Sequence, residues 1–197
     1  MKQIVFQVPE EKLTSYATLL QFGIFLEYHV GQAIGIFISD LPGIDIDYIA
    51  DRIQTIFLDG NAVDDMETPF STASRTLALS AAMPGLAGAI FRKNSMHAAL
   101  RTFESQPASA AQTDEKFLVC LKLFNTIASE KGPGILAQGG VFPGATLIDF
   151  FQLRSKLKED IIHITMKQNE MDAEAFWPLL DPAEKYHVKI RPKTESQ

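Results

Sequence analysis

The stretch Thr55-Ile56-Phe57-Leu58-Asp59-Gly60-Asn61-Ala62-Val63 carries the clearest β-hairpin signal of the chain. An apolar run comes first, and the pair Asp59-Gly60 follows it directly. Such a pair is among the stronger local hairpin signals, because glycine accepts the positive φ of a tight turn. The stretch therefore predicts a strand over 52–58 that turns at Asp59-Gly60.

Segments of strand and helix character lie on both sides of this hairpin. Strands are predicted over 3–8, 22–30, 76–80, 117–124, 161–166 and 186–190. Helices are predicted over 10–20, 89–103, 126–138, 146–157 and 172–180, the third of them with a break at Gly132-Pro133-Gly134. This mixture predicts an α+β fold.

One segment has the composition of a domain boundary. Residues 104–115 contain no large apolar side chain, which predicts a linker or exposed loop over 105–115. A chain of 197 residues suits one large domain or two small ones. We therefore expect a first α+β domain over 1–104, ending in a helix, and a second over 116–192. The tail, 193–197, is expected to be disordered.

Charge and hydropathy limit the classes of partner. The chain has 18 Lys and Arg against 24 Asp and Glu, a net charge of −6, and non-specific nucleic-acid binding needs a basic face instead. The longest near-apolar run, 77–91, is shorter than the ~20 residues that span a bilayer. The first apolar stretch ends at Pro9, which is too short for the core of a signal peptide. We expect a soluble protein of the bacterial-type cytoplasm with no transmembrane segment.

The single cysteine and the histidines give no clear metal or redox pattern. Cys120 lies in an apolar run, so it is expected to be buried, and an intramolecular disulfide or cysteine-based zinc cluster is excluded. No two of the four histidines have ligand spacing on one helix. His163 and His187 fall in predicted strands of the second half and could meet in space.

An acidic group follows the hairpin turn: Asp59, Asp64, Asp65 and Glu67. Carboxylate oxygens could hold a divalent cation there. Aspartates are also typical of turns, because they hydrogen-bond to nearby backbone, and the spacing of a calcium loop is missing. The sequence therefore predicts neither a metal site nor a cofactor.

The stretch 22–88 reads as a strand, a short helix, the hairpin, a further strand over 76–80, and an end that contains Pro84-Gly85. In this order it resembles the ubiquitin-like β-grasp sulfur carriers, such as the molybdopterin-synthase small subunit and the thiamine-pathway carrier. The resemblance covers about a third of the chain and implies a β-grasp-like N-terminal lobe, followed by a second small α+β lobe. Those carriers end in a free glycine carboxylate, whereas Gly85 and Gly88 are followed by about a hundred residues. Carrier chemistry is therefore not implied unless the chain is cut.

A candidate anion site lies after the last strand of that stretch. Its residues are Gly85, Gly88, Arg92, Lys93 and His97. A small-residue loop that enters a helix can bring backbone N–H groups close to an anion, and the cations could add contacts. The alternative is tight packing of the loop, with Arg92 and Lys93 solvated. Neither of the common phosphate-loop motifs is present.

Three functions stay open at this point. The first is a non-catalytic protein-interaction or regulatory protein that self-associates, since no catalytic constellation is visible in the sequence. The second is a small enzyme or ligand-binding protein that holds an anionic, phosphate-bearing ligand at Gly85–Lys93. The third is a peripheral membrane protein that uses residues 77–91.

Overall fold

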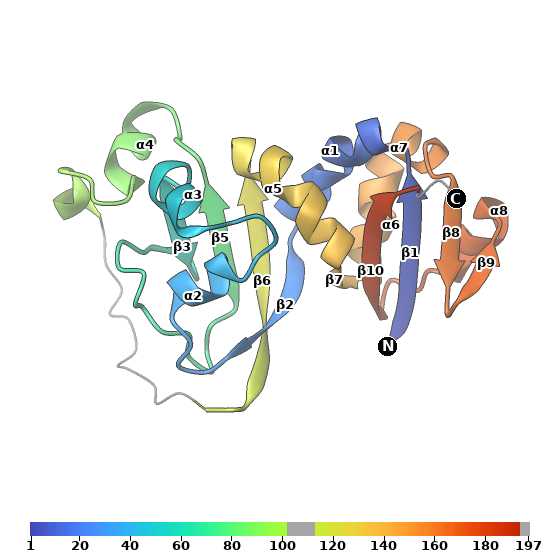
Figure 1. Ribbon diagram of the computed structural model, residues 1–197, viewed down its shortest axis with the longest axis horizontal. Helices are drawn as coiled ribbons and strands as arrows, with labels where there is room; N and C mark the ends of the chain where they lie inside the picture. Colours follow the sequence, from blue (N-terminus) through green and yellow to red (C-terminus); the bar gives the residue numbers. More distant parts are fainter. Residues whose placement is uncertain (102–112, 194–197) are drawn as a thin grey trace. The chain divides into compact units, whose positions relative to one another are not determined.

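The computed structural model describes residues 1–101 and 113–193, and its fold is α+β (Figure 1). Packing divides the chain into two compact units: residues 1–24 with 128–197 form unit 1, and residues 25–127 form unit 2. The two ends of the chain meet in unit 1, because its first and last strands are neighbours in one sheet. The predicted linker at 105–115 falls mostly outside the described residues, so a domain division there stays a prediction.

The sheet of unit 1 has the strand order β7-β10-β1-β8-β9. Its strands are β1 (Lys2–Val8), β7 (Gly140–Pro143), β8 (His163–Met166), β9 (Asn169–Met171) and β10 (Lys185–Pro192). The central strand β1 runs parallel to β10 and antiparallel to β8. The predicted strands at 3–8 and 186–190 are confirmed, and the one predicted over 161–166 forms from His163 onward, whereas β7 and β9 are not among the predicted strands.

Short helices cover one face of this sheet. They are η1 (Glu10–Lys12), α1 (Leu13–Tyr16), η2 (Ala17–Gln21), α6 (Gly144–Leu153), α7 (Ser155–Glu159), α8 (Ala173–Phe176) and η4 (Trp177–Leu179). Phe6 of β1 lies at the centre of the core, with ring centroids 5.5 Å from those of Phe151 and Phe176. Burial of such large aromatic side chains dominates the stability of a small core.

Helix α5 (Asn125–Gln138) is continuous, with Pro133 inside it. The predicted break at Gly132-Pro133-Gly134 is therefore wrong. The ring of a proline disfavours the helical conformation of the preceding residue partly through that residue's Cβ, and Gly132 has none. A Cβ at Gly132 would also lie 2.6 Å from the Cβ of Ala17, so the glycine lets α5 approach η2 closely.

The sheet of unit 2 has the strand order β4-β3-β5-β6-β2. Its strands are β2 (Ile24–His29), β3 (Thr55–Leu58), β4 (Asn61–Ala62), β5 (Thr76–Ser80) and β6 (Lys116–Phe124), and its helices are α2 (Ile34–Ser39), α3 (Ile46–Asp51), α4 (Gly85–Phe91) and η3 (Ala98–Leu100). Strand β5 runs antiparallel to β3 and parallel to β6.

The hairpin that opened the sequence analysis is confirmed. Leu58 of β3 pairs with Asn61 of β4, and the turn residues Asp59 and Gly60 have φ of +50° and +85°. The strand starts at Thr55 rather than 52, because α3 runs to Asp51 and leaves only a short connection.

The predicted helix over 89–103 is replaced by two short ones. α4 begins at Gly85, four residues earlier than predicted, and ends at Phe91. Arg92 then has an extended conformation with φ −60° and ψ 136°, which ends the helix. The chain turns back before η3, and residues 102–103 lie outside the described part.

Candidate functional site

The predicted anion site lies on α4 and the turns after it. Gly85 is the first residue of this helix and Gly88 the fourth, whereas Arg92 and Lys93 follow its last residue. Gly85 therefore lies at the opposite end of the helix from the cations, whereas the carbonyl of Gly88 accepts a hydrogen bond from the N–H of Arg92 at 3.1 Å.

Both cations of the predicted site have partners in the protein. Arg92 donates from Nε to Oε1 of Gln54 at 2.7 Å, and the Nζ of Lys93 donates to the carbonyl of Ile49 at 2.9 Å. Burial lowers the pKa of Lys93, and nearby Asp51 and Asp64 oppose that shift. These contacts attach the end of α4 to α3 and to the segment that joins α3 to β3.

A small cavity of about 130 Å³ contains two of the five predicted residues. It is lined by Gln54, Thr55, Ala82, Met83, Gly88, Ala89 and Arg92. The other three, Gly85, Lys93 and His97, do not line it. A Cβ at Gly88 would run into the carbonyl oxygen of Met83, which means that close backbone packing alone requires glycine there. The anion site stays a prediction.

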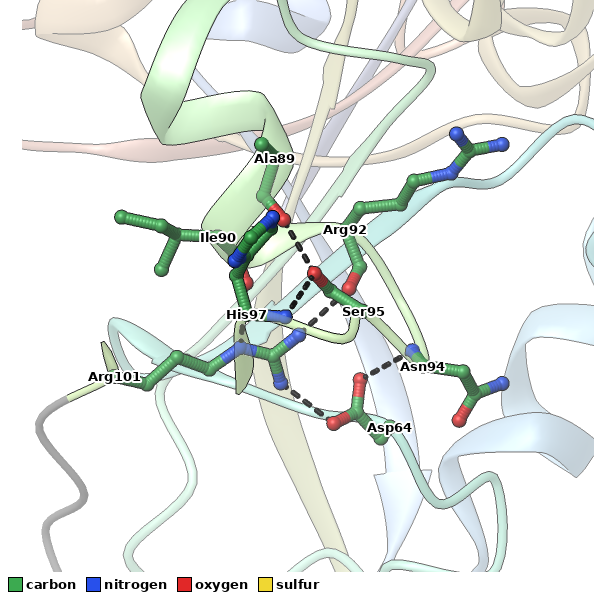
Figure 2. A network of polar contacts seen from close by, with 8 residues as sticks. All are labelled: Asp64, Ala89, Ile90, Arg92, Asn94, Ser95, His97 and Arg101. Carbon is green, nitrogen blue, oxygen red and sulfur yellow. Dashed lines mark hydrogen bonds and ion pairs between the residues drawn. The ribbon is translucent and has the colours of Figure 1, made fainter. Parts of the chain in front are cut away.

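The residues around α4 are held by a buried arginine (Figure 2). Arg101 donates from Nε to the carbonyl of Ile90 at 2.8 Å, from Nη2 to that of Arg92 at 2.6 Å, and from Nη1 to Asp64 at 2.6 Å. Its side chain is 1% exposed. The carbonyls at the end of a helix lack partners within the helix and carry partial negative charge, so a cation is favoured there.

Three of the four acidic residues at and after the hairpin turn, Asp59, Asp64 and Asp65, accept hydrogen bonds from backbone N–H groups. Asp59 accepts hydrogen bonds from the backbone N–H of Arg75 and Thr76 at 2.9 and 2.7 Å. Asp64 accepts from the N–H of Asn94 as well as from Arg101, and Asp65 accepts from the N–H of Glu67. Among the described residues, no three His, Cys, Asp or Glu side chains gather as a metal ion would need.

Cys120 is buried, as predicted, and burial raises the pKa of its thiol. A raised pKa leaves less thiolate at neutral pH, and thiolate is the reactive form. His163 and His187 lie on β8 and β10 and pair with Gln7 and Gln3 of the strand between them. The two histidines are thus offset by four residues along β1 and do not form one site.

A second candidate site, which the sequence analysis did not identify, is the face of the unit 1 sheet that is turned away from α6 (Figure 1). Burial alternates along the strands: Ile4 and Phe6 of β1 are fully buried, whereas Gln3 is exposed and Val5 half-buried. We name this surface the open face. It presents Gln3, Val5, Gln7, His163, Thr165, Glu170, Lys185, His187, Lys189 and Arg191.

A hollow of about 1010 Å³ lies along β1 on the open face. It is lined by Met1, Lys2, Gln3, Val5, Thr165, Lys167, Gln168, Glu184, Lys185 and Arg191. Gln3 and Val5 come from the central strand, and longer side chains from β10 and from the turn after β8 lie on either side. It has about twice the volume of the neighbouring hollow of about 470 Å³ that Met166, Asn169 and Met171 help to line.

The lining of this hollow has an excess of positive charge. Its one acidic residue, Glu184, accepts a hydrogen bond from Lys2 at 2.7 Å, and this bond raises the pKa of the lysine. The lining also contains Lys167, Lys185 and Arg191, so it has four cationic side chains against one carboxylate. Elsewhere on the open face, Glu170 pairs with His163. The open face is therefore basic, although the whole chain carries −6.

A signal for the open face was present in the sequence. Residues 185, 187, 189 and 191 are Lys, His, Lys and Arg, and buried residues alternate with them. Alternate residues of a strand point to the same side of the sheet, so a period of two in basic residues predicts a basic face.

Within residues 1–101 and 113–193, no helix is long and apolar enough to cross a membrane. Of the near-apolar run 77–91, Leu77 and Leu79 are fully buried in the sheet of unit 2. Comparison of the chain with protein-family models, with curated proteins and with solved structures finds no match.

Proposed function

We propose that this protein is a non-catalytic interaction protein that binds an acidic segment of a partner protein on its open face. The observation that carries this proposal is the hollow along β1, whose lining has four cationic side chains against one carboxylate. Carboxylates placed between lysine and arginine side chains form charge-assisted hydrogen bonds, which are about twice as strong as neutral ones.

The shape of the hollow favours an extended peptide. Its lining reaches from Lys185 to Arg191 along β10, and seven residues of strand span about 20 Å. An extended segment of similar length could lie above Gln3 and Val5, with acidic side chains directed to both sides. Volumes of roughly 300–1,000 Å³ are typical of ligand sites, so the hollow is large enough for such a segment.

Single-stranded nucleic acid fits the hollow less well. Proteins that bind it stack bases on aromatic side chains, and the lining contains none. The net charge of −6 also works against a long polyanion, which would extend beyond the basic surface.

The test uses a fluorescent hexaglutamate peptide, whose anisotropy is followed on titration with the protein at low and high salt. The expected result is binding that weakens as salt is raised, because exposed charges are screened. Arg191→Glu should weaken binding at least about tenfold. Lys156→Glu on α7 makes the same change in net charge outside the lining and should bind as wild type does. Equal binding by wild type and Arg191→Glu, or tighter binding of oligothymidylate than of the peptide, would sink the proposal.

A second candidate function rests on the cavity shared by Gly88 and Arg92. A small phosphate-bearing ligand held there should raise the melting temperature of the protein. The expected result for inorganic phosphate is a shift that Arg92→Ala abolishes. A shift of the same size in that variant would exclude this cavity as the site.

A further inference from the structure

We propose that the acidic partner of the open face is a second copy of this chain, which contributes the surface formed by α2 and α3 of unit 2. This inference rests on the proposed function and names its partner.

The negative charge of the chain is concentrated in unit 2. Residues 25–127 contain 7 Lys and Arg against 12 Asp and Glu, whereas the remainder contains 11 against 12. Unit 2 therefore carries −5 of the net −6, and unit 1 is nearly neutral. Two copies can attract each other through unlike surfaces even though their net charges repel, because the Debye length is only about 8 Å at physiological salt.

The acidic surface of unit 2 lies on two adjacent short helices. Its exposed carboxylates are Asp40 after α2, Asp45 before α3, and Asp47 and Asp51 within α3. Two large apolar side chains are exposed on the same helices: Ile36 at 55% and Ile46 at 79%. We name this set of six residues the acidic surface.

The two surfaces match in chemistry. The open face and its turn have the cations Lys167, Lys189 and Arg191, and the acidic surface has the exposed carboxylates of Asp40, Asp47 and Asp51. The open face also has apolar groups: Val5 is half-buried and Met1 is 77% exposed. Apolar side chains surrounded by complementary charges are the usual arrangement of a specific protein interface.

A contact between unlike surfaces joins copies head to tail. Such a contact either closes into a ring or continues as an open chain. In both cases every contact joins one open face to one acidic surface, so reversing the charge on either surface alone should prevent association. A molecule with a charge-reversed open face should, however, bind a molecule with a charge-reversed acidic surface.

The experiment measures the molar mass of the full chain by light scattering after size exclusion, over a range of concentrations, at about 50 mM and about 500 mM NaCl. The variants are Lys167→Glu/Arg191→Glu on the open face and Asp40→Lys/Asp47→Lys on the acidic surface. Asp45 is left unchanged because its carboxylate caps α3 by accepting from the N–H of Tyr48 at 2.8 Å. Circular dichroism checks that each variant folds.

The control is Asp114→Lys/Glu115→Lys, which alters two exposed acids of unit 2 outside α2 and α3 and raises the net charge as much as Asp40→Lys/Asp47→Lys does. We expect wild type and control to associate at low salt, and each charge-reversed variant to associate at least about tenfold more weakly. In the mutant proteins, the reversed open face repels the native acidic surface. The Glu pair of the first variant can still bind the Lys pair of the second, so an equimolar mixture should recover complexes that contain both.

Three results would overturn the inference: wild type that stays monomeric at every concentration, a control that associates as weakly as the reversed variants, or reversed variants that associate as wild type does. The hexaglutamate titration separates this failure from that of the proposed function. A monomeric protein that still binds the peptide through Arg191 keeps the open face as a docking site and requires a different partner.

Discussion

The guanidinium of Arg101 lies 2.6 Å from the carboxylate of Asp64, a residue 37 positions earlier in the chain. The arginine side chain is 1% exposed, and that of Asp64 is 33% exposed. Because Arg101 also bonds two carbonyls at the end of α4, this ion pair connects the turn after the hairpin to the helix of the predicted anion site. The position of α4 therefore depends on a residue that the sequence analysis did not single out.

Arg101→Ala should lower the free energy of unfolding by roughly 3 kcal/mol, because removing one partner of a buried ion pair leaves charge and carbonyls without compensation. Urea denaturation measures the change, and hydrogen exchange should show faster exchange over residues 85–97. Arg75→Ala is the matched control: Arg75 also donates to a main-chain carbonyl, that of Thr72 at 2.7 Å, but it is exposed. Equal losses in the two variants would mean that burial of the pair contributes nothing.

Gly88→Ala should destabilise the protein by at least about 2 kcal/mol, since the new Cβ would meet the backbone carbonyl of Met83 and the chain would have to move. Gly85→Ala is the comparison. Gly85 has φ of +74° and open space around its Cβ position. Alanine there should lower the free energy of unfolding by only about 1 kcal/mol, because its sole penalty is the left-handed backbone conformation. Thermal unfolding of both variants shows which substitution causes the larger loss of stability. A larger loss at Gly85 than at Gly88 would contradict the packing described for α4.

The elements that short stretches of sequence specify by themselves could be predicted. Asp59-Gly60 specifies a turn by backbone preference alone, and β1 and β6 follow from short apolar runs of strand-forming residues. The α+β class follows from these elements. The pairing of the strands could not be predicted. The parallel neighbours β1 and β10 lie at opposite ends of the chain, and no local sequence pattern indicates which strands are paired.

The candidate site was predicted less well, for a physical reason. Gly85 to His97 are close in the chain, but Gly85 lies at the start of α4, whereas Arg92 and Lys93 follow its end and bond to Gln54 and Ile49. The cations of the open face come from β10 and from the turn after β8, which the sheet brings together across β1. A site of this kind becomes visible only when the strand order is known.

Gly132→Ala should lower the free energy of unfolding by about 1–3 kcal/mol, because the added methyl would lie 2.6 Å from the Cβ of Ala17 and 3.1 Å from Leu20. The same crowding predicts a favourable coupling with Ala17→Gly, which removes the opposing methyl group. Denaturation of both single variants and of the double variant gives that coupling energy. Additive effects in this cycle would show that the close approach of α5 to η2 is not what requires glycine at position 132.

Acid should weaken the folded state through His187. Burial, and then the neighbouring Lys189, lower the pKa of His187 below its ordinary value of 6.5. Below pH 6.5 the unfolded chain therefore binds a proton at this residue more readily than the folded chain does, so the free energy of unfolding falls as the pH drops through that window. His187→Gln removes this contribution and should make urea unfolding less dependent on pH between about 7.5 and 5.5. Gln3→Ala is the control, because it changes the residue paired with His187 without removing a titratable group. If both His187→Gln and Gln3→Ala keep the pH dependence of wild type, His187 does not cause the loss of stability in acid.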